Sequence, residues 1–507
     1  MRPGQTFFRF CAIAGLCNFY HAEPPQAVVQ QPLDHRYSPQ LFNALHAAGR
    51  LFASTMDHNG LTVFMASVPR GTLFYHGTNQ SEAVTTGIEY LAFEPELSRL
   101  FANGCKRPSL FQEAMRSPAE VRSGKPSDDL PCLRNPGYFH TYRPTRDLSL
   151  LYLDGQAAAK TTAGAMDMQY RLFVGSIDYE MDESEQTRRI CRTFKERGWD
   201  LDGVLRMEME FEIILCDFGL MRLEHVVEIP PLQTTAVLSD RRKEEEAKQM
   251  MGFNLVTSAN ARFNGFERGK LDIDFENIVS AFAHDEYDLY PNGSDLPRFT
   301  APTEGDVERF RQDIDAAVER RRYRVAEEGA LPYVDWQAIT DRIVSRYAPR
   351  LTYLSSDEFK SNAKRLRKHA ELIISYLDPT SSRGHFMKRC MHQDMPLLAN
   401  YVADSAAPRA ILDVARLICA TLLDVATDQK LSLKQIRSRL KTLKSRLGWR
   451  EWDICKGCQD DEICSTVAWP FGARGEEKRP TCRKVADILQ RGYWDDTALP
   501  GRRGFRD

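Results

Sequence analysis

Residues 203–220, GVLRMEMEFEIILCDFGL, alternate apolar and acidic side chains more regularly than any other stretch of the chain. A period of two is typical of a β-strand, in which successive side chains point to opposite faces. We therefore expect a strand with Glu208, Glu210 and Glu212 on one face and apolar residues on the other. Three acids on one face fit either a polar cleft or a solvated surface, and the alternation alone leaves both open.

Shorter segments of the same character precede this strand. Gly, Pro and Ser separate five further strand-like runs, at residues 61–66, 73–76, 90–93, 148–153 and 170–174. The chain up to about residue 229 therefore mixes strands with helices.

From about residue 306 the pattern is mostly helical. Residues 335–349 predict a helix that stops at Pro349. Residues 432–448 predict another, which ends at Gly448. Its apolar stripe consists of Leu433, Ile436, Leu440, Leu443 and Leu447.

The predicted fold class is α+β, in five parts. These are a signal peptide at 1–22, an α+β domain at 23–235, a connecting region at 236–304, a helical domain at 305–448 and a Cys-rich tail at 449–507. Ser38-Pro39 begins a predicted helix that Gly49 ends. A charged run at 239–251 predicts a solvated helix in the connecting region.

The first residues have the layout of a secretory signal peptide. Arg2 and Arg9 lie before and beside an apolar stretch at 10–17, and proline-rich sequence follows. An ordinary hydrophobic N-terminus is the alternative interpretation. A membrane span is not expected, since it needs roughly 20 apolar residues. With this signal peptide, we expect a secreted protein. The net charge of −2 gives no overall attraction to nucleic acid or membrane, so we expect it to bind neither.

The tail carries four closely spaced cysteines, Cys455, Cys458, Cys464 and Cys482. The spacing C-x2-C-x5-C-x17-C would allow a tetrahedral zinc site, but the second half lacks a matching C-x2-C. Disulfides are the favoured interpretation for a secreted chain, with zinc and free thiols as alternatives. Of twelve cysteines, ten lie beyond the predicted signal peptide.

Residues 73–102, LFYHGTNQSEAVTTGIEYLAFEPELSRLFA, contain a strand-like run that ends in His76-Gly77-Thr78. The glycine would let a flat ligand lie against the main chain, beside an imidazole and a hydroxyl. A second run begins with Tyr90, and a short predicted helix follows it. Without further support, His76 could equally be a polar residue that ends a strand, and Tyr90 a core residue.

Taken in order, these segments resemble the three motifs of the ADP-ribosyltransferase superfamily, of the diphtheria-toxin and poly(ADP-ribose)-polymerase type. LFYHGT resembles the strand that ends in His-Gly, YLAFEPELSRLFA the aromatic-led strand and helix, and MEMEFEIILCD the strand that carries a glutamate. The resemblance covers residues 69–219, and residues 103–139 would be an insertion. It implies an antiparallel two-sheet core and NAD as the substrate, with an unknown protein or small-molecule acceptor.

The resemblance also implies roles for individual residues. Glu212 would stabilise the oxocarbenium-like transition state of nicotinamide–ribose cleavage, with Glu210 as its helper and Glu208 as a third acid. His76 would bind the adenosine ribose, and Tyr90 would stack on the nicotinamide ring. Gly77 and Thr78 would complete this cofactor-binding set, with the Gly77 backbone binding the nicotinamide amide.

Arg143 and Arg146, between the second and third motifs, could reach the pyrophosphate, although surface salt bridges explain them equally well. A glycosylation sequon at Asn79 conflicts with a ligand site so close to His76. Residues 150–164 superficially resemble a phosphate loop. They lack the required glycines at Asp154 and Ala159, so we expect no nucleotide-triphosphate site there. A secreted interaction protein that keeps the fold without the chemistry remains the alternative function, and a hydrolase that uses the acids is a third.

Overall fold

The structure is a computed structural model of the 507-residue chain. It describes residues 35–104, 135–230, 241–267, 269–326, 334–357, 362–395, 405–472, 475–476, 479–484 and 487–488. The predicted signal peptide, most of the predicted insertion and the end of the tail lie outside these ranges.

Nine strands form one large sheet in the order β8-β4-β2-β3-β7-β6-β5-β1-β9. The strands are β1 (Thr62–Val68), β2 (Phe74–Thr78), β3 (Glu89–Ala92), β4 (Gly137–Pro144), β5 (Leu148–Leu153), β6 (Gly203–Met207), β7 (Phe211–Leu215), β8 (Met221–Ile229) and β9 (Asp272–Ser280). All neighbouring pairs are antiparallel except β5 and β6. The predicted α+β class is therefore confirmed, with one large sheet in place of the expected two.

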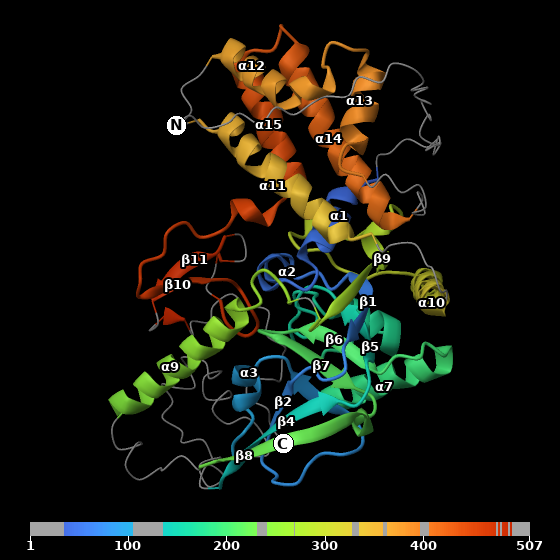
Figure 1. Ribbon diagram of the computed structural model, residues 1–507, viewed down its shortest axis with the longest axis vertical. Helices are drawn as coiled ribbons and strands as arrows, with labels where there is room; N and C mark the ends of the chain where they lie inside the picture. The colour runs from blue at the N-terminus through green and yellow to red at the C-terminus, as the bar shows by residue number, and fades with distance from the viewer. Residues whose placement is uncertain are drawn as a thin grey trace, which may run out of the picture.

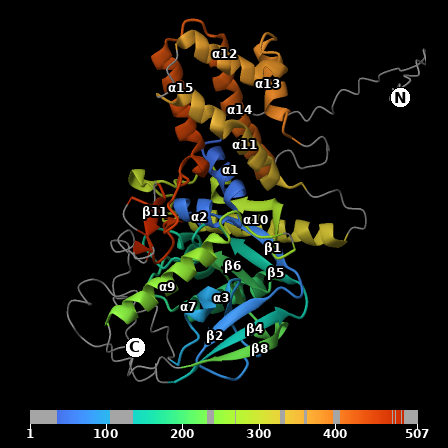
Figure 2. The same ribbon diagram turned by 60° about the vertical axis from the view of Figure 1, so that its left-hand side comes forward.

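Twelve α-helices accompany the sheet in the described residues. They are α1 (Ser38–Ala47), α2 (Leu51–Asp57), α3 (Pro95–Arg99), α6 (Asp167–Gln169), α7 (Glu183–Arg197), α9 (Arg241–Asn260), α10 (Glu304–Ala326), α11 (Trp336–Ser355), α12 (Ala363–Ile374), α13 (Arg383–His392), α14 (Ala406–Thr427) and α15 (Leu433–Leu447). Figures 1 and 2 show α11–α15 gathered at one end of the long axis and the sheet at the other, with α1 and α2 between them.

The acidic segment forms a hairpin rather than one strand. Strands β6 and β7 are antiparallel, with Arg206 opposite Glu212 and Met207 opposite Phe211, so residues 208–210 form the turn between them. The prediction of three acids on one strand face was therefore wrong. Met209 is buried at the centre of the turn, and its packing accounts for a reversal that no Gly, Pro, Asn or Asp announces.

Two other local predictions also fail. The apolar run Tyr170–Val174 is a π-helical turn that continues α6, and Gly175 ends it with φ of 93°. Helix α11 continues through Pro349 to Ser355. Proline removes one helical hydrogen bond. Leu351 and Leu354 in the next turn are fully buried, and their packing stabilises the helix beyond the proline.

The C-terminal helices follow the sequence pattern closely. Helix α15 begins with a capping box in which Ser432 and Gln435 each bond the other's backbone, and it ends at Gly448, whose φ is 58°. Four residues of its predicted stripe are buried, and the fifth, Leu433, is half-buried.

The sheet and the helical part share segments across the predicted domain boundaries. Strand β9, from the predicted connecting region, pairs with β1 and forms one edge of the sheet. Helix α1 packs against α11 and α14, and the Ser38 hydroxyl donates to Asp413 Oδ2 at 2.5 Å. The N-terminal helix is therefore part of the contact between the sheet and the helical end.

Four disulfides lie within the described residues, Cys191–Cys216, Cys390–Cys419, Cys455–Cys464 and Cys458–Cys482. The last two join the tail cysteines, as the favoured interpretation expected. Each has one cysteine in a two-stranded sheet, Cys464 in β10 (Glu462–Ser465) and Cys482 in β11 (Thr481–Lys484). None of the described helices is both long enough and apolar enough to cross a membrane.

Candidate functional site

The three segments that carry the motifs lie side by side in the sheet. Strand β2 ends in His76-Gly77-Thr78, β3 contains Tyr90 and leads into α3, and β7 contains Glu212. The order β2-β3-β7 makes them immediate neighbours. Segments separated by about 130 residues in the sequence therefore meet in one part of the fold.

Strands β2 and β3 are joined by a single residue pair, Tyr75 with Ala92. Beyond this pair the His76 side chain bonds the backbone of β3, with its Nδ1 2.9 Å from the Tyr90 carbonyl oxygen. A carbonyl can only accept, so Nδ1 carries the proton and Nε2 is the second position of the ring for a partner. No hydrogen bond to Nε2 occurs among the described residues.

Gly77 is held against the segment that follows β3. A Cβ at this position would lie 1.9 Å from the Ser98 carbonyl oxygen and 2.6 Å from the Ala102 nitrogen, so only glycine fits. Phe101, in the same turn, exposes 38% of its surface. The sequence predicts this aromatic residue on the apolar side of the short helix in the second motif, together with Leu97 and Leu100.

Glu212 lies in a cluster of charges around a buried arginine. The side chain of Arg206 is 1% exposed, and its Nε donates to Glu212 Oε1 at 2.8 Å. Its Nη2 donates to Glu183 at the start of α7, which also binds Lys160. The Tyr90 hydroxyl lies 3.2 Å from Thr187 Oγ1, one turn further along α7. Burial and then Glu183 raise the pKa of Tyr90.

The acids of this cluster differ in their protonation. Burial opposes ionisation of Glu183, but Lys160 and Arg206 outweigh it, so the pKa of Glu183 lies below its usual range. Burial raises the pKa of Glu208, and the charges of Glu212 and Glu183 raise it further. The environment therefore favours the protonated form of Glu208 and the ionised form of Glu183.

Glu210 belongs to a different environment. Burial raises its pKa well above the usual value, and the charges nearest to it are Glu94, Glu96 and Arg262. None of these surrounds Glu212. The hairpin thus places Glu208 and Glu212 near α7 and separates them from Glu210, the predicted helper.

His76 and Glu212 point to different sides of the sheet. Tyr75 pairs with Ala92, and Ala92 pairs with Glu212, so these three share one face. His76 follows Tyr75 and belongs to the other face, where its ring lies 6.3 Å from those of His140 and Phe218. A ligand can touch both groups only where β2 and β3 separate.

The predicted phosphate contacts have other partners. Arg146 makes a bidentate ion pair with Asp202, at 2.8 and 2.6 Å. Arg143 donates to the Gly71 carbonyl and lies 3.8 Å from Glu224. Thr78 accepts a hydrogen bond from the Gln80 backbone at 3.3 Å. The sequence analysis missed Glu183 and Arg206, whose only signal was their charge, and considered Lys160 only as part of the rejected phosphate loop.

A groove of about 880 Å³ runs along the C-terminal half of α7. Ile88, two residues before Tyr90, forms part of its lining, as does the Cys191–Cys216 disulfide. The charged residues of the groove are Arg188, Arg192, Lys195, Asp200 and Arg322. Arg188 and Arg322 pair with Glu185 and Glu319 outside the groove, so Arg192 and Lys195 are the cations that would stabilise a phosphate group there.

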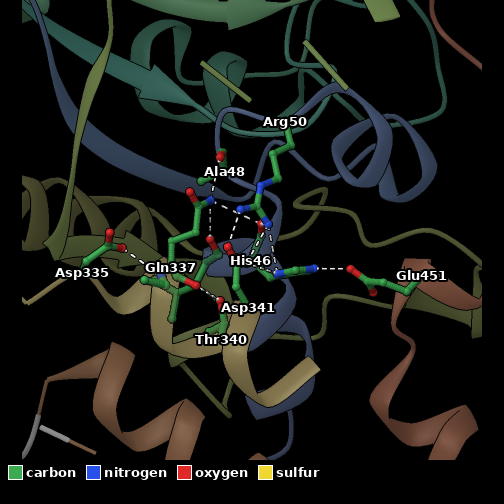
Figure 3. Close-up of polar contacts among 10 residues, drawn as sticks. His46, Ala48, Arg50, Asp335, Gln337, Thr340, Asp341 and Glu451 are labelled. Atoms are coloured by element: carbon green, nitrogen blue, oxygen red, sulfur yellow. Dashed lines mark hydrogen bonds and ion pairs between the residues drawn. The ribbon is translucent and has the colours of Figure 1, made fainter. Parts of the chain in front are cut away.

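A second polar cluster joins the sheet end of the molecule to the helical end. The His46 ring, on α1, lies with Nδ1 2.8 Å from Asp341 of α11 and Nε2 2.5 Å from Glu451. Arg50 binds both oxygens of Asp341, at 2.7 and 2.6 Å. Figure 3 shows the imidazole held between the two carboxylates. Both nitrogens must donate, so this geometry favours the imidazolium form.

This cluster predicts a pH-dependent contribution to stability. Burial alone would lower the pKa of His46, but its bonds to Asp341 and Glu451 raise it above 6.5. Burial would raise the pKa of Asp341, but Arg50 and His46 lower it to about 2. The pKa of Glu451 is also lowered, from 4.5, by its bond to His46, although burial opposes this. The contribution should therefore be complete between pH 4.5 and 6.5. It is lost as the pH rises through the raised pKa of His46, and it is lost progressively below pH 4.5 as first Glu451 and then Asp341, whose pKa is about 2, take up protons.

We expect His46→Gln to remove about 1 kcal/mol at pH 5, a value reduced for the partial exposure of Asp341. The loss should shrink at pH 8. Urea denaturation across this range measures it, with His385→Gln at an exposed position of α13 as the control. Equal losses at pH 5 and pH 8 would contradict the proposed imidazolium.

One family model and two yeast relatives are similar to this chain. A family model described as the YPL277C N-terminal domain matches residues 27–137 and 125–249, which include β1–β8 and the Glu212 cluster. The chain is 26% identical to Uncharacterized protein YOR389W of Saccharomyces cerevisiae, over 86% of this chain and 82% of that protein. It is 28% identical to Uncharacterized protein YPL277C of the same yeast, over 64% of this chain and 76% of that protein. No solved structure matches the chain.

Proposed function

We propose that this protein is an ADP-ribosyltransferase-like enzyme that cleaves NAD at the nicotinamide–ribose bond. The observation that carries the proposal is the arrangement of β2, β3 and β7. The three motif-bearing strands are neighbours, and the His76 imidazole bonds the Tyr90 carbonyl where the first two strands separate. An NAD molecule lying across this separation would meet His76 Nε2 on one side and Glu212 on the other.

The charge cluster suits the chemistry that the proposal requires. Cleavage develops positive charge on the ribose, and a carboxylate fixed beside it stabilises that charge. Glu212 is held by Arg206 and is 13% exposed, so it is positioned and shielded from water. The basic groove along α7 offers cations for the pyrophosphate, in place of Arg143 and Arg146. The acceptor is water or a macromolecule.

The disulfides support a secreted location for this activity. Four bridges within the described residues fit an oxidising compartment. The predicted signal peptide would direct the chain there, and sequencing the N-terminus of the mature protein tests this part of the proposal.

The decisive test is NAD hydrolysis by the purified protein and its variants. We expect Glu212→Gln to lower kcat about 100-fold, because it removes the negative charge that stabilises the transition state. His76→Ala should raise KM, because it removes a contact to the substrate. Glu210→Gln is the matched control, since Glu210 lies two residues away in a different environment. Equal effects of Glu212→Gln and Glu210→Gln would contradict the assignment.

A non-catalytic interaction protein is the second candidate, and one observation favours it. The Glu212 carboxylate is already bound to Arg206, which a buried structural network holds in place. A protein that had lost the chemistry would keep this network for stability alone. Binding of a non-hydrolysable NAD analogue separates the two candidates. If the protein neither binds the analogue nor hydrolyses NAD, the interaction protein is favoured and the enzymatic proposal is removed.

A further inference from the structure

A cavity of about 890 Å³ lies beside the His46 cluster, between α1, α11, α15 and the turn Arg450–Trp452. Its volume is within the range of sites for nucleotide-sized ligands. The charged and aromatic lining that matters here consists of Asp341, Tyr353, Lys444, Glu451, Trp452 and Lys456. Nothing in the proposed NAD chemistry uses this cavity.

The acids of the cavity are already neutralised. Asp341 is bound by Arg50 and His46, and Glu451 is bound by His46 through Oε1. These four groups form a balanced set of two cations and two anions. Any further charge in the lining is therefore in excess.

That excess charge comes from two lysines. The closest hydrogen-bonding contact of Lys444 Nζ is the Thr352 hydroxyl at 3.5 Å, and the ammonium lies 4.7 Å from the centre of the Trp452 ring. Burial and the charge of Lys456 lower the pKa of Lys444. The charge of Asp453, which lies outside the cavity lining, opposes this shift and raises the pKa of Lys444. Asp453 is shared with Arg450, whose Nη1 lies 3.5 Å from its carboxylate. An anion between the lysines would relieve their repulsion.

One other feature of the lining suits an organic ligand rather than a simple ion. Tyr353 exposes 45% of its surface, which offers an apolar ring face.

We propose that this cavity binds a small organic anion of nucleotide size, with its phosphate or carboxylate group between Lys444 and Lys456. The apolar part of the ligand lies along Tyr353. The site joins three segments of the chain, so its occupation also holds the helical end against α1.

Isothermal titration calorimetry of the full-length protein with AMP, citrate and inorganic phosphate tests the proposal. We expect AMP or citrate to bind more tightly than inorganic phosphate, and the better of the two identifies the acidic group as phosphate or carboxylate. Lys444→Met should weaken that binding at least 10-fold, and Lys456→Met less, because Lys456 is the more exposed. The effect should diminish at high salt.

Lys434→Met is the matched control, because Lys434 is exposed on the same helix and lies outside the cavity. Circular dichroism checks that each variant remains folded. Failure of all three probes to bind at millimolar concentration would overturn the proposal, as would equal affinities of the Lys444 and Lys434 variants. Glu212→Gln should leave this binding unchanged, so the result is independent of the NAD proposal.

Discussion

Replacing Arg206 by methionine is expected to lower the free energy of unfolding by about 3–5 kcal/mol at pH 7. The guanidinium is almost fully buried and binds Glu183 and Glu212. Methionine fills much of the volume but leaves two carboxylates with Lys160 as the remaining cation of the cluster. Removing one partner of a buried ion pair costs more than the pair itself contributes, because the remaining charge stays away from water.

Chemical denaturation measures this effect, and Arg188→Met on α7 is the control. Arg188 is 53% exposed and pairs with Glu185, so its loss should cost less than about 1 kcal/mol. The Arg206→Met defect should become smaller in acid, where the carboxylates are protonated. A loss below about 1 kcal/mol for Arg206→Met would show that the cluster relaxes to bring its acids into water.

Removing the Cys191–Cys216 disulfide is expected to cost about 3 kcal/mol, from the entropy of a loop that spans 25 residues. The bridge ties α7 to the residue that follows β7, so it also holds Glu183 and Thr187 over Arg206 and Tyr90. The double variant Cys191→Ala, Cys216→Ala avoids leaving a free thiol. Thermal and urea unfolding measure the stability, and NAD turnover measures the effect on the site.

A second disulfide provides the comparison. The double variant Cys458→Ala, Cys482→Ala removes a bridge of similar span, 24 residues, which joins the tail to itself. It should loosen the tail and leave NAD turnover unchanged. If both double variants lowered turnover equally, the Cys191–Cys216 bridge would have no special role in positioning α7.

The regular elements were predictable where one local signal dominates. Helix α15 has a capping box, an apolar stripe and a terminal glycine, all of which agree, and its bounds match the prediction. The reversal at 208–210 was not predictable in the same way. Its residues are Glu, Met and Glu, and what stabilises the turn is the burial of Met209 among residues distant in sequence.

The candidate site was predictable only in outline. His76, Tyr90 and Glu212 were expected on strands, and they lie on the neighbouring strands β2, β3 and β7. The charges around Glu212 come from three other segments. In the sequence, Arg206 lies on the polar side of an alternating strand, a position that predicts a solvent-exposed side chain. Burial of a guanidinium depends on two acids supplied by the tertiary fold, which no local pattern records.

The pairing of β1 with β9 decides how the chain can be divided. The sequence match to the yeast family model ends at residue 249, whereas β9 runs from Asp272 to Ser280. A recombinant fragment cut at that match would leave the backbone of β1 unpaired along an apolar edge, a surface prone to pair with another molecule. The smallest piece that keeps both neighbours of β1 therefore extends through Ser280, well beyond the end of the match to the family model.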